Sequence, residues 1–228
     1  MATLTYHGHS TCSIVTDGGA TIVIDPFFEG NPACGTSVDD VEADFILVTH
    51  AHGDHMADLI PLAKRTGALV ISSHELVSWL ATHGVGNTHG MSIGGGYTFP
   101  FGYAKMTPAA HGAKNEGPGG EGYPTTPAGF LINLEGGKRV YHAGDTALLM
   151  DMQLLKGQVD LALLPIGDNY TMGPADAVRA VGFIEPKTVV PIHYNTFPPI
   201  SQDPEAFRAA VGSAAHVEIV APGGSYEF

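Results

Sequence analysis

The chain has 228 residues, 44% of them hydrophobic, and its 23 acidic against 10 basic residues give a formal net charge of −13. This length and composition allow a large buried core, and because no composition shift divides the chain, we expect one domain over residues 1–228. The negative charge opposes the phosphate-neutralising surface that long nucleic acids require, so no nucleic-acid partner is expected. A small-molecule substrate, including an anionic one, is compatible with this net charge.

The sequence carries no sign of a membrane segment. No stretch approaches about 18 continuous apolar residues, and the run Met1 to Tyr6 lacks the basic and apolar regions of a signal peptide. The two cysteines, Cys12 and Cys34, are expected to be reduced, because one pair in a chain of this size is weak evidence for an oxidising compartment. We therefore expect a cytoplasmic protein with no membrane partner.

The first half of the chain begins with a predicted meander of three short strands, with Asp17-Gly18-Gly19 as the turn between the last two. The apolar run Phe45 to Val48 is typical of a buried strand. Pro61 fits the helix that follows only near its start, where backbone donors lack partners. Strands are predicted at 3–6, 12–16, 21–24, 45–48, 69–72 and 104–107, and helices at 57–66 and 75–82.

The second half repeats this pattern. Two strands flank the turn Glu135-Gly136-Gly137-Lys138 as a hairpin, and a helix is predicted next, ended by Gly157. Strands are predicted at 128–134, 139–142, 161–164, 188–191 and 217–220, and helices at 148–156, 174–182 and 204–211. Strands that alternate with helices predict an α/β protein with mixed sheets covered by helices.

The run Thr49-His50-Ala51-His52-Gly53-Asp54-His55 follows one of these buried strands. Its first two histidines leave the carboxyl end of the strand together, and Asp54 and His55 fall where the next helix begins. Imidazole nitrogens and carboxylate oxygens suit zinc, manganese and iron. Four ligands so close in sequence could not all bind one tetrahedral ion and leave a position open for chemistry. The run therefore predicts two metal ions.

Further ligands are expected at other strand ends, because only strand ends converge on one point above a sheet. His111, Asp145 and His193 each follow a predicted strand, at the place where an apolar run stops. These three residues complete a candidate set of metal ligands.

With these residues in place, the sequence resembles the metallo-β-lactamase superfamily, whose signature is His-x-His-x-Asp-His followed downstream by a His, an Asp and a last His. The resemblance implies that His50, His52 and His111 hold the first metal, that Asp54, His55 and His193 hold the second, and that Asp145 bridges them. It also implies a four-layer αββα sandwich of two mixed β-sheets flanked by helices, which periodicity alone does not distinguish from other α/β arrangements. The runs Tyr6-His7-Gly8-His9-Ser10, Ile24-Asp25-Pro26-Phe27, Thr171-Met172-Gly173-Pro174 and Pro191-Ile192-His193-Tyr194-Asn195-Thr196 look like small metal-dependent hydrolases near the ascorbate-6-phosphate lactonases.

Two divalent cations at such a site predict a hydrolytic mechanism. A water that bridges them loses a proton near neutral pH, and the hydroxide attacks an ester, lactone or phosphoester bond of a small metabolite. One ion polarises the oxygen under attack, and the other stabilises the charge on the leaving oxygen. Asp54 and Asp145 are the candidate catalytic residues. Zinc or manganese is the expected metal, and iron is compatible with the same ligands.

Other residues are candidates for contacts behind the ligands or with the substrate. Asp25 ends an apolar strand and is placed to hydrogen-bond a ligating imidazole from behind, with a turn cap as the alternative. His9 has a site role or is one of two turn histidines, whereas His142, inside a strand, is expected to be structural. The remaining candidates are Lys114 and Tyr123 in the segment 112–127, which is a lid or a surface insertion, Asp168 in a loop before a helix, and Asn195 after the last histidine.

Several alternatives stay open at this point. A mononuclear iron thiol dioxygenase shares the ligand pattern, and a non-catalytic metal-binding sensor could keep it. Two other readings are disfavoured. The flavodiiron branch, by resemblance, carries a glutamate where His52 stands and adds a flavin domain for which no chain is left, and a β-lactamase would need a basic clamp that is not evident after His193. A homo-oligomer is compatible with the apolar segment 197–200, which could equally form a pocket rim.

Overall fold

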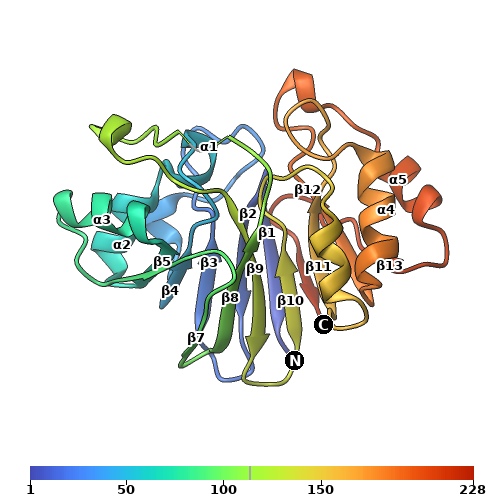
Figure 1. The fold of residues 1–228 in the computed structure, drawn as a ribbon, viewed down its shortest axis with the longest axis horizontal. Coiled ribbons are helices and arrows are strands. Elements are labelled where there is room, and N and C mark those ends of the chain that lie inside the picture. Colours follow the sequence, from blue (N-terminus) through green and yellow to red (C-terminus); the bar gives the residue numbers. More distant parts are fainter. Residues whose placement is uncertain (113) are drawn as a thin grey trace.

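The computed structural model describes residues 1–112 and 114–228. Two seven-stranded sheets pack face to face, and helices cover the outer side of each sheet (Figure 1). This arrangement is the predicted αββα sandwich. In the described ranges, no helix combines the length and the apolar character that crossing a membrane would need.

The first sheet has the strand order β14-β1-β2-β3-β4-β5-β6. Its strands are β1 (Thr3–Gly8), β2 (Thr11–Val15), β3 (Thr21–Ile24), β4 (Phe45–Leu47), β5 (Leu69–Ser73), β6 (Thr88–Met91) and β14 (Ser225–Glu227). Strands β14 and β1 to β3 pair antiparallel, and β3 to β6 pair parallel. The helical segments of this half are η1 (Val38–Asp40), α1 (Gly53–Met56), α2 (Leu59–Thr66) and α3 (His74–Thr82).

The second sheet repeats the plan in the order β13-β12-β11-β10-β9-β8-β7. Its strands are β7 (Gly96–Phe99), β8 (Gly102–Pro108), β9 (Ala128–Leu134), β10 (Arg139–His142), β11 (Leu161–Pro165), β12 (Thr188–Ile192) and β13 (His216–Val217). Strands β7 to β10 pair antiparallel, and β10 to β13 pair parallel. The helical segments are η2 (Gly120–Gly122), η3 (Met150–Leu155), α4 (Pro174–Ile184), η4 (Pro198–Ile200) and α5 (Pro204–Val211).

Strand periodicity explains why the layers stack in this way. Successive side chains of a strand point to opposite faces, so Leu47 and Ile71 enter the core between the sheets while Ile46 and Val70 pack under the helices. Each of these side chains is fully buried, and such burial stabilises the fold by roughly 1.5–3 kcal/mol per large aliphatic residue. A third apolar cluster joins the other sheet to α4, α5 and η3.

The predicted elements are present with a few corrections. Pro61 is the third residue of α2, within its first turn, as expected. The segment predicted as an α-helix at 148–156 is the shorter 3-10 helix η3, because its turns close by hydrogen bonds three residues apart, such as Met152 N–H to the Leu149 carbonyl. The strand predicted at 217–220 is only β13, which pairs with two residues of β12. Strands β6, β7 and β14 were not predicted.

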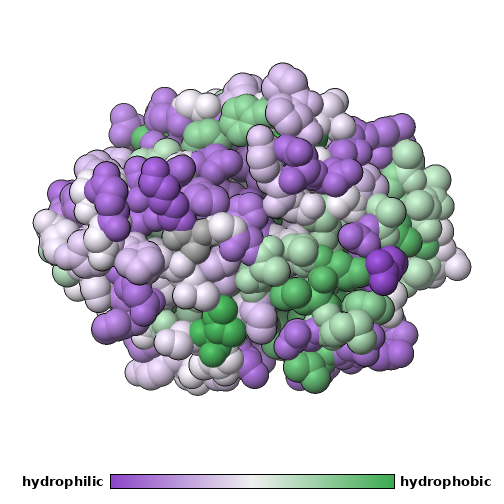
Figure 2. Space-filling model, turned by 45° about the horizontal axis from the view of Figure 1, so that its top comes forward, coloured by the Kyte–Doolittle hydropathy of each residue, from purple (hydrophilic) through white to green (hydrophobic). Residues whose placement is uncertain are grey.

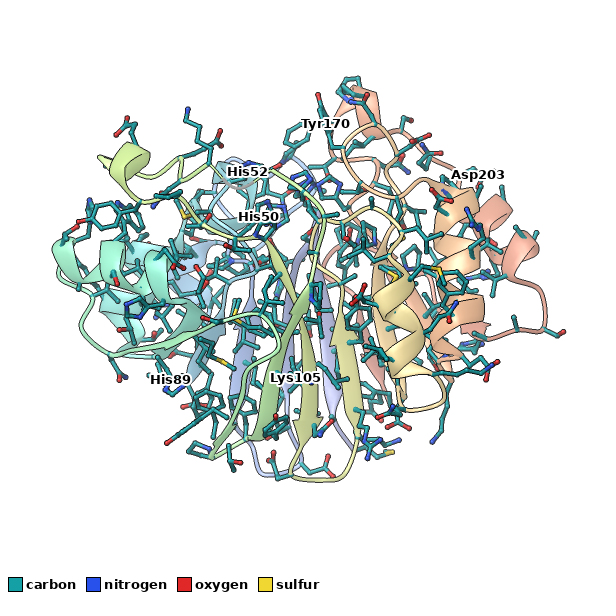
Figure 3. All side chains as sticks on the ribbon, viewed as in Figure 1. His50, His52, His89, Lys105, Tyr170 and Asp203 are labelled. Carbon is teal, nitrogen blue, oxygen red and sulfur yellow. The ribbon has the colours of Figure 1, made fainter. Side chains whose placement is uncertain are left out.

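The topology brings the loops that follow several strands to one edge of the molecule. Parallel strands β3, β4, β10, β11 and β12 all end there, because parallel neighbours share a direction. Figure 3 shows His50 and His52 above these strand ends and His89 toward the opposite ends of the strands.

Candidate metal centre

The first group of imidazoles comes from the two loops that follow β4 and β8. His50, His52 and His111 each offer a ring nitrogen, and these atoms lie within 4.8 Å of one another. His52 Nδ1 is 3.0 Å from His50 Nε2 and 3.3 Å from His111 Nε2. Burial lowers the pKa of both His50 and His111, which favours the neutral imidazole that binds metals.

The second group holds four residues, one more than the sequence predicts. His9, Asp54, His55 and His193 offer ligand atoms that also lie within 4.8 Å of one another. Asp54 and His55 belong to α1, and His193 directly follows β12. Three nitrogens and one carboxylate oxygen of this kind suit a divalent cation such as zinc or manganese.

The Asp145 carboxylate lies between the two groups. Its Oδ2 atom is 3.0 Å from His193 Nε2, 3.3 Å from His55 Nε2 and 3.5 Å from His111 Nε2. Although burial raises the pKa of Asp145, the neighbouring His55 and His193 hold it well below its usual range. An ionised carboxylate that contacts both groups occupies the position expected of a bridging ligand.

The donor atoms of the centre fit a bound cation. His55 Nε2 and Asp145 Oδ1 are buried, and among the described residues neither has a hydrogen-bond partner. Buried polar atoms are rarely left in this state unless an ion or a water completes them. Two carboxylates, Asp145 and Asp25, raise the pKa of His55 well above its usual value despite its burial, so this position favours positive charge. A divalent cation would meet that demand.

Asp25 supports one imidazole of each group from behind. Its Oδ1 accepts a hydrogen bond from the Thr49 backbone N–H at 2.7 Å, and its Oδ2 accepts from Thr49 Oγ1 at 2.7 Å and from His55 Nδ1 at 2.8 Å. Because the Thr49 hydroxyl donates to Asp25, it accepts from His50 Nδ1, 3.0 Å away. In their neutral forms, both imidazoles therefore carry their proton on Nδ1 and turn Nε2 to the centre. The sequence indicated Asp25, but not Thr49.

His9 connects the second group to the strand ends of both sheets. The ring is fully buried, and its Nε2 lies 3.1 Å from Asp54 Oδ2 while Nδ1 lies 3.0 Å from Thr196 Oγ1. Burial lowers the pKa of His9 to about 4, so the contact with Asp54 is a hydrogen bond from a neutral imidazole rather than an ion pair. That bond, together with the nearby His55, holds the pKa of Asp54 below its usual range although burial raises it.

The backbone at these strand ends adopts strained conformations. His9, Asp25 and His193 have φ angles of 58°, 50° and 53°, a left-handed region that residues with a side chain seldom adopt. The His193 N–H donates to the His9 carbonyl at 2.7 Å, which ties the two turns together. Such strain persists only where surrounding contacts enforce it, and it is common at functional sites.

Four of the predicted contact residues do not join the clustered ligands. Asp168 and Asn195 are exposed and shape their own loops, because they accept hydrogen bonds from the backbone N–H groups of Asn169 and Gln202. Tyr123 packs against the apolar cluster under the helices of the first half, which commits its ring to packing. Lys114 is exposed and makes no hydrogen bond or ion pair within the ranges described.

The segment 112–127, predicted to be a lid or a surface insertion, includes Ala113, which lies outside the described residues. The described part is attached to the first half of the molecule. The Trp79 indole N–H donates to the Pro118 carbonyl at 3.2 Å, and Glu116 Oε2 accepts from the Gly53 N–H at 3.0 Å. His142 is structural as expected, because its ring donates to the Ser10 carbonyl and accepts from the Gly144 N–H.

The sandwich and the paired His/Asp groups at its edge define a class of protein, the metal-dependent hydrolases of the metallo-β-lactamase fold. A family model described as "Beta-lactamase superfamily domain" matches residues 20–194, and the chain therefore belongs to the metallo-β-lactamase superfamily.

Within the superfamily, the chain is similar to metal-dependent hydrolases called UPF0173. It is 52% identical over 214 residues to one from Shouchella clausii, covering 92% of this chain and 93% of the relative. It is 48% identical over 233 residues to one from Heliobacterium modesticaldum, covering 98% and 96%. The solved structure of Igni18, a metallo hydrolase from Ignicoccus hospitalis, matches with a TM-score of 0.88 at 38% identity and covers 100% of this chain and 99% of Igni18. These names specify no substrate, so the lactonase-like branch stays a prediction.

Proposed function

We propose that this metal-dependent hydrolase is binuclear and cleaves an ester, lactone or phosphoester bond of a small metabolite. The observation that carries the proposal is the position of Asp145, whose single Oδ2 atom lies within 3.5 Å of nitrogens from both imidazole groups. A carboxylate that contacts two ligand groups is suited to hold two cations at a working separation.

The chain divides the ligands between two ions. His50, His52 and His111 would hold one, and Asp54, His55 and His193 would hold the other, with Asp145 shared. The ions, zinc or manganese by ligand type, would supply Lewis-acid activation and a hydroxide nucleophile near neutral pH.

Besides binding one ion, Asp54 could contact the attacking water. Its side chain is 36% exposed, in contrast to the buried Asp145, and His9 fixes its Oδ2 atom by a hydrogen bond. The low pKa keeps Asp54 ionised at neutral pH. The carboxylate can therefore accept a hydrogen bond from the attacking water and orient it.

A panel of hydrolysis assays tests the proposal. The protein is loaded separately with zinc and with manganese, its metal content is measured by mass spectrometry, and it is offered lactones, phosphodiesters and thioesters. We expect two ions per chain and turnover of one substrate class. Asp145→Asn should lose one ion and at least about 100-fold in rate, because one shared ligand positions both ions. The matched control Asp39→Asn changes an exposed aspartate of η1 and should behave as wild type.

Three results would contradict the proposal. Full activity with one ion per chain would exclude the shared role of Asp145. Iron as the only metal retained, together with oxygen consumption in the presence of thiols, would favour a thiol dioxygenase. Silence across the panel in fully metallated protein would favour a non-catalytic metal-binding role.

A further inference from the structure

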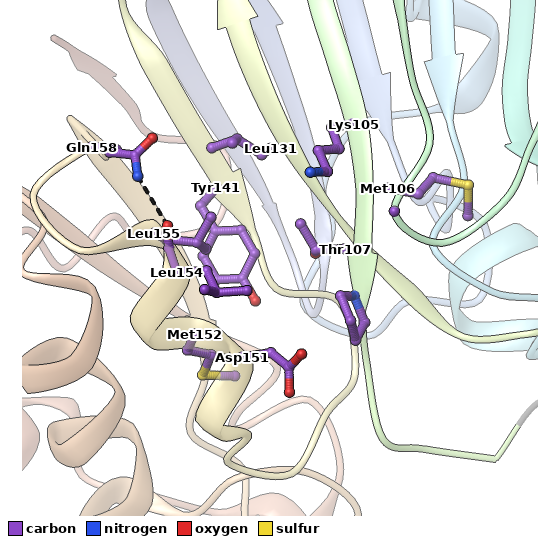
Figure 4. Close-up of a pocket in the computed structure, with 12 residues that line it drawn as sticks. Lys105, Met106, Thr107, Leu131, Tyr141, Asp151, Met152, Leu154, Leu155 and Gln158 are labelled. Atoms are coloured by element: carbon purple, nitrogen blue, oxygen red, sulfur yellow. Dashed lines mark hydrogen bonds between the residues drawn. The ribbon is translucent and has the colours of Figure 1, made fainter.

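A pocket away from the metal centre lies on the outer face of the second sheet. It has a volume of about 320 Å³ and is enclosed by β8, β9 and β10 on one side and by η3 on the other (Figure 4). Pockets of a few hundred Å³ with apolar walls and few polar groups are typical of sites for small molecules.

Strand periodicity builds the floor of this pocket. Lys105 pairs with Leu131, which pairs with Tyr141, so one row of side chains crosses three strands on the outer face. Their neighbours Ala104 and Ile132 point instead into the core between the sheets. The row is not covered by α4 or α5, which pack over the strands nearer the other edge (Figure 1).

A glycine allows the strands under the floor to approach closely at its inner end. Gly129 pairs with Thr107, and a Cβ at position 129 would lie 2.7 Å from Thr107 Oγ1 and 2.7 Å from the His142 carbonyl oxygen. No larger residue fits there without displacing a strand. On the opposite side, the apolar wall comes from Met152, Leu154 and Leu155 of η3.

The polar groups of the pocket differ in their partners, since the Gln158 amide donates to the Leu154 carbonyl at 2.9 Å (Figure 4). Lys105 is half-buried, and no carboxylate among the described residues pairs with it, although the chain carries a net charge of −13. Thr107 is 8% exposed, and its Oγ1 makes no hydrogen bond of regular geometry in the described parts of the chain. Asp151 and Gln158 belong to the η3 side, and Figure 4 shows the Lys105 amine and the Asp151 carboxylate at opposite ends.

The pocket is separate from the metal centre. The Ala110 N–H donates to Thr146 Oγ1 at 3.0 Å, and the Ala147 N–H donates to the Ala110 carbonyl at 3.1 Å. In the first segment, Ala110 lies between the pocket residue Pro108 and the candidate ligand His111. In the second segment, Thr146 and Ala147 lie between the candidate ligand Asp145 and the pocket residue Asp151. A molecule in the pocket is therefore not expected to need a metal ion.

The rim of the pocket continues into an apolar surface. Met150 and Leu154 are 66% and 75% exposed, and Figure 2 shows apolar residues gathered below and to the right of its centre, on the side that carries η3. Exposed apolar groups beside an unpaired cation favour an occupant that has both an apolar body and an acid group.

We infer that this pocket binds a small amphipathic anion, with its apolar body against Leu131, Leu154 and Leu155 and its carboxylate or phosphate on the Lys105 amine. The Thr107 hydroxyl donates a second hydrogen bond to the acid group. The negative charge of Asp151 fixes the orientation, because it repels the acid group from the far end of the pocket.

Isothermal titration calorimetry with three probes tests this inference. Octanoate and octyl phosphate share the apolar chain and differ in the acid group, whereas octanol lacks the charge. We expect both acids to bind with one site per chain, with or without zinc, and octanol to bind at least about tenfold more weakly, because a hydrogen bond assisted by charge is stronger than a neutral one. The stronger acid identifies the preferred head group. Binding only in the presence of zinc would overturn the inference, since the anion would then bind the metal centre.

Two variants locate the site. Lys105→Gln should weaken octanoate at least about tenfold, and Leu154→Glu, at an exposed rim position, should weaken it further by adding negative charge. The control Lys64→Gln removes an exposed lysine of α2 and should bind as wild type. Unchanged binding in both variants would overturn the inference. The inference would also be overturned if the protein bound neither acid and formed a dimer that Leu154→Glu dissociates. The surface would then be an interface with a second copy of the chain.

Discussion

Single hydrogen bonds decide which nitrogen of the candidate ligands His50 and His55 can face the candidate metal centre. Asp25 is fully buried, and as a carboxylate it can only accept, so its donors are fixed as Thr49 and His55. Because the Thr49 hydroxyl donates its proton to Asp25, it can only accept a hydrogen bond from His50 Nδ1. One carboxylate thus sets the proton positions of two imidazoles that belong to different ligand groups.

The Asp25→Asn substitution tests this role. An asparagine amide would present N–H groups where Thr49 Oγ1 or His55 Nδ1 now donates, so the two imidazoles would lose their fixed tautomers. We expect zinc affinity, measured by competition with a chromogenic chelator, to fall about 10–100-fold. Asp44→Asn is the matched control, because Asp44 also accepts from a backbone N–H, that of Thr21, but lies before β4 rather than after β3. Wild-type affinity in Asp25→Asn would show that the tautomers are set by other contacts.

Among the elements, the turns after the strands place the candidate ligands, and the turn after β10 is a closely packed example. Gly144 has a φ angle of 63°, and a Cβ there would lie 2.5 Å from the Ala128 carbonyl oxygen and 3.1 Å from Thr49 Cβ. The next residue is Asp145. The position of the Asp145 carboxylate after β10 therefore depends on the absence of a side chain at residue 144.

We expect Gly144→Ala to lower both stability and metal content. Gly137→Ala is the matched control, because Gly137 also has a positive φ, of 84°, but nothing lies within 4 Å of its added Cβ. The control should lose only the strain of a left-handed alanine, about 1–2 kcal/mol in the free energy of unfolding measured in urea. Gly144→Ala should lose clearly more and bind less zinc. Equal losses in the two variants would mean that the loop after β10 adapts without moving Asp145.

The elements also show what the sequence can predict. Strands buried on both faces, such as β4 and β11, are continuous apolar runs and were predicted, as were the candidate ligands at strand ends that the structure brings together. Strands β6, β7 and β14 lie at or beside sheet edges and are largely exposed, so no apolar alternation marks them. The hydrogen bonds that Thr49 makes to Asp25 and His50 were not predictable, because they depend on the direction of its side chain, which the packing of the turn after β4 sets.

At the scale of the whole molecule, the candidate ligands connect the two halves of the sandwich. His50 and His55 follow β4 of the first sheet, whereas Asp145 and His193 follow β10 and β12 of the second. The edge of the sandwich brings together imidazoles and carboxylates, and among the described residues the buried Asp145 Oδ1 has no hydrogen-bond partner. Ions shared by both halves would satisfy these groups and link the sheets at the edge where the loops are strained.

Metal should therefore stabilise the fold, and ligands from both halves should be needed for the full effect. At a zinc concentration about 1,000-fold above Kd, binding to the native state adds about 4 kcal/mol, which for a chain of this size raises Tm by roughly 8–16 °C relative to protein treated with a chelator. His50→Ala in the first half and His193→Ala in the second should each remove most of this shift, measured by calorimetry. The control His74→Ala, at the exposed start of α3, should keep it. If either ligand variant kept the whole shift, the ions would bind within one half, and the strained turns of the other half would need a different explanation.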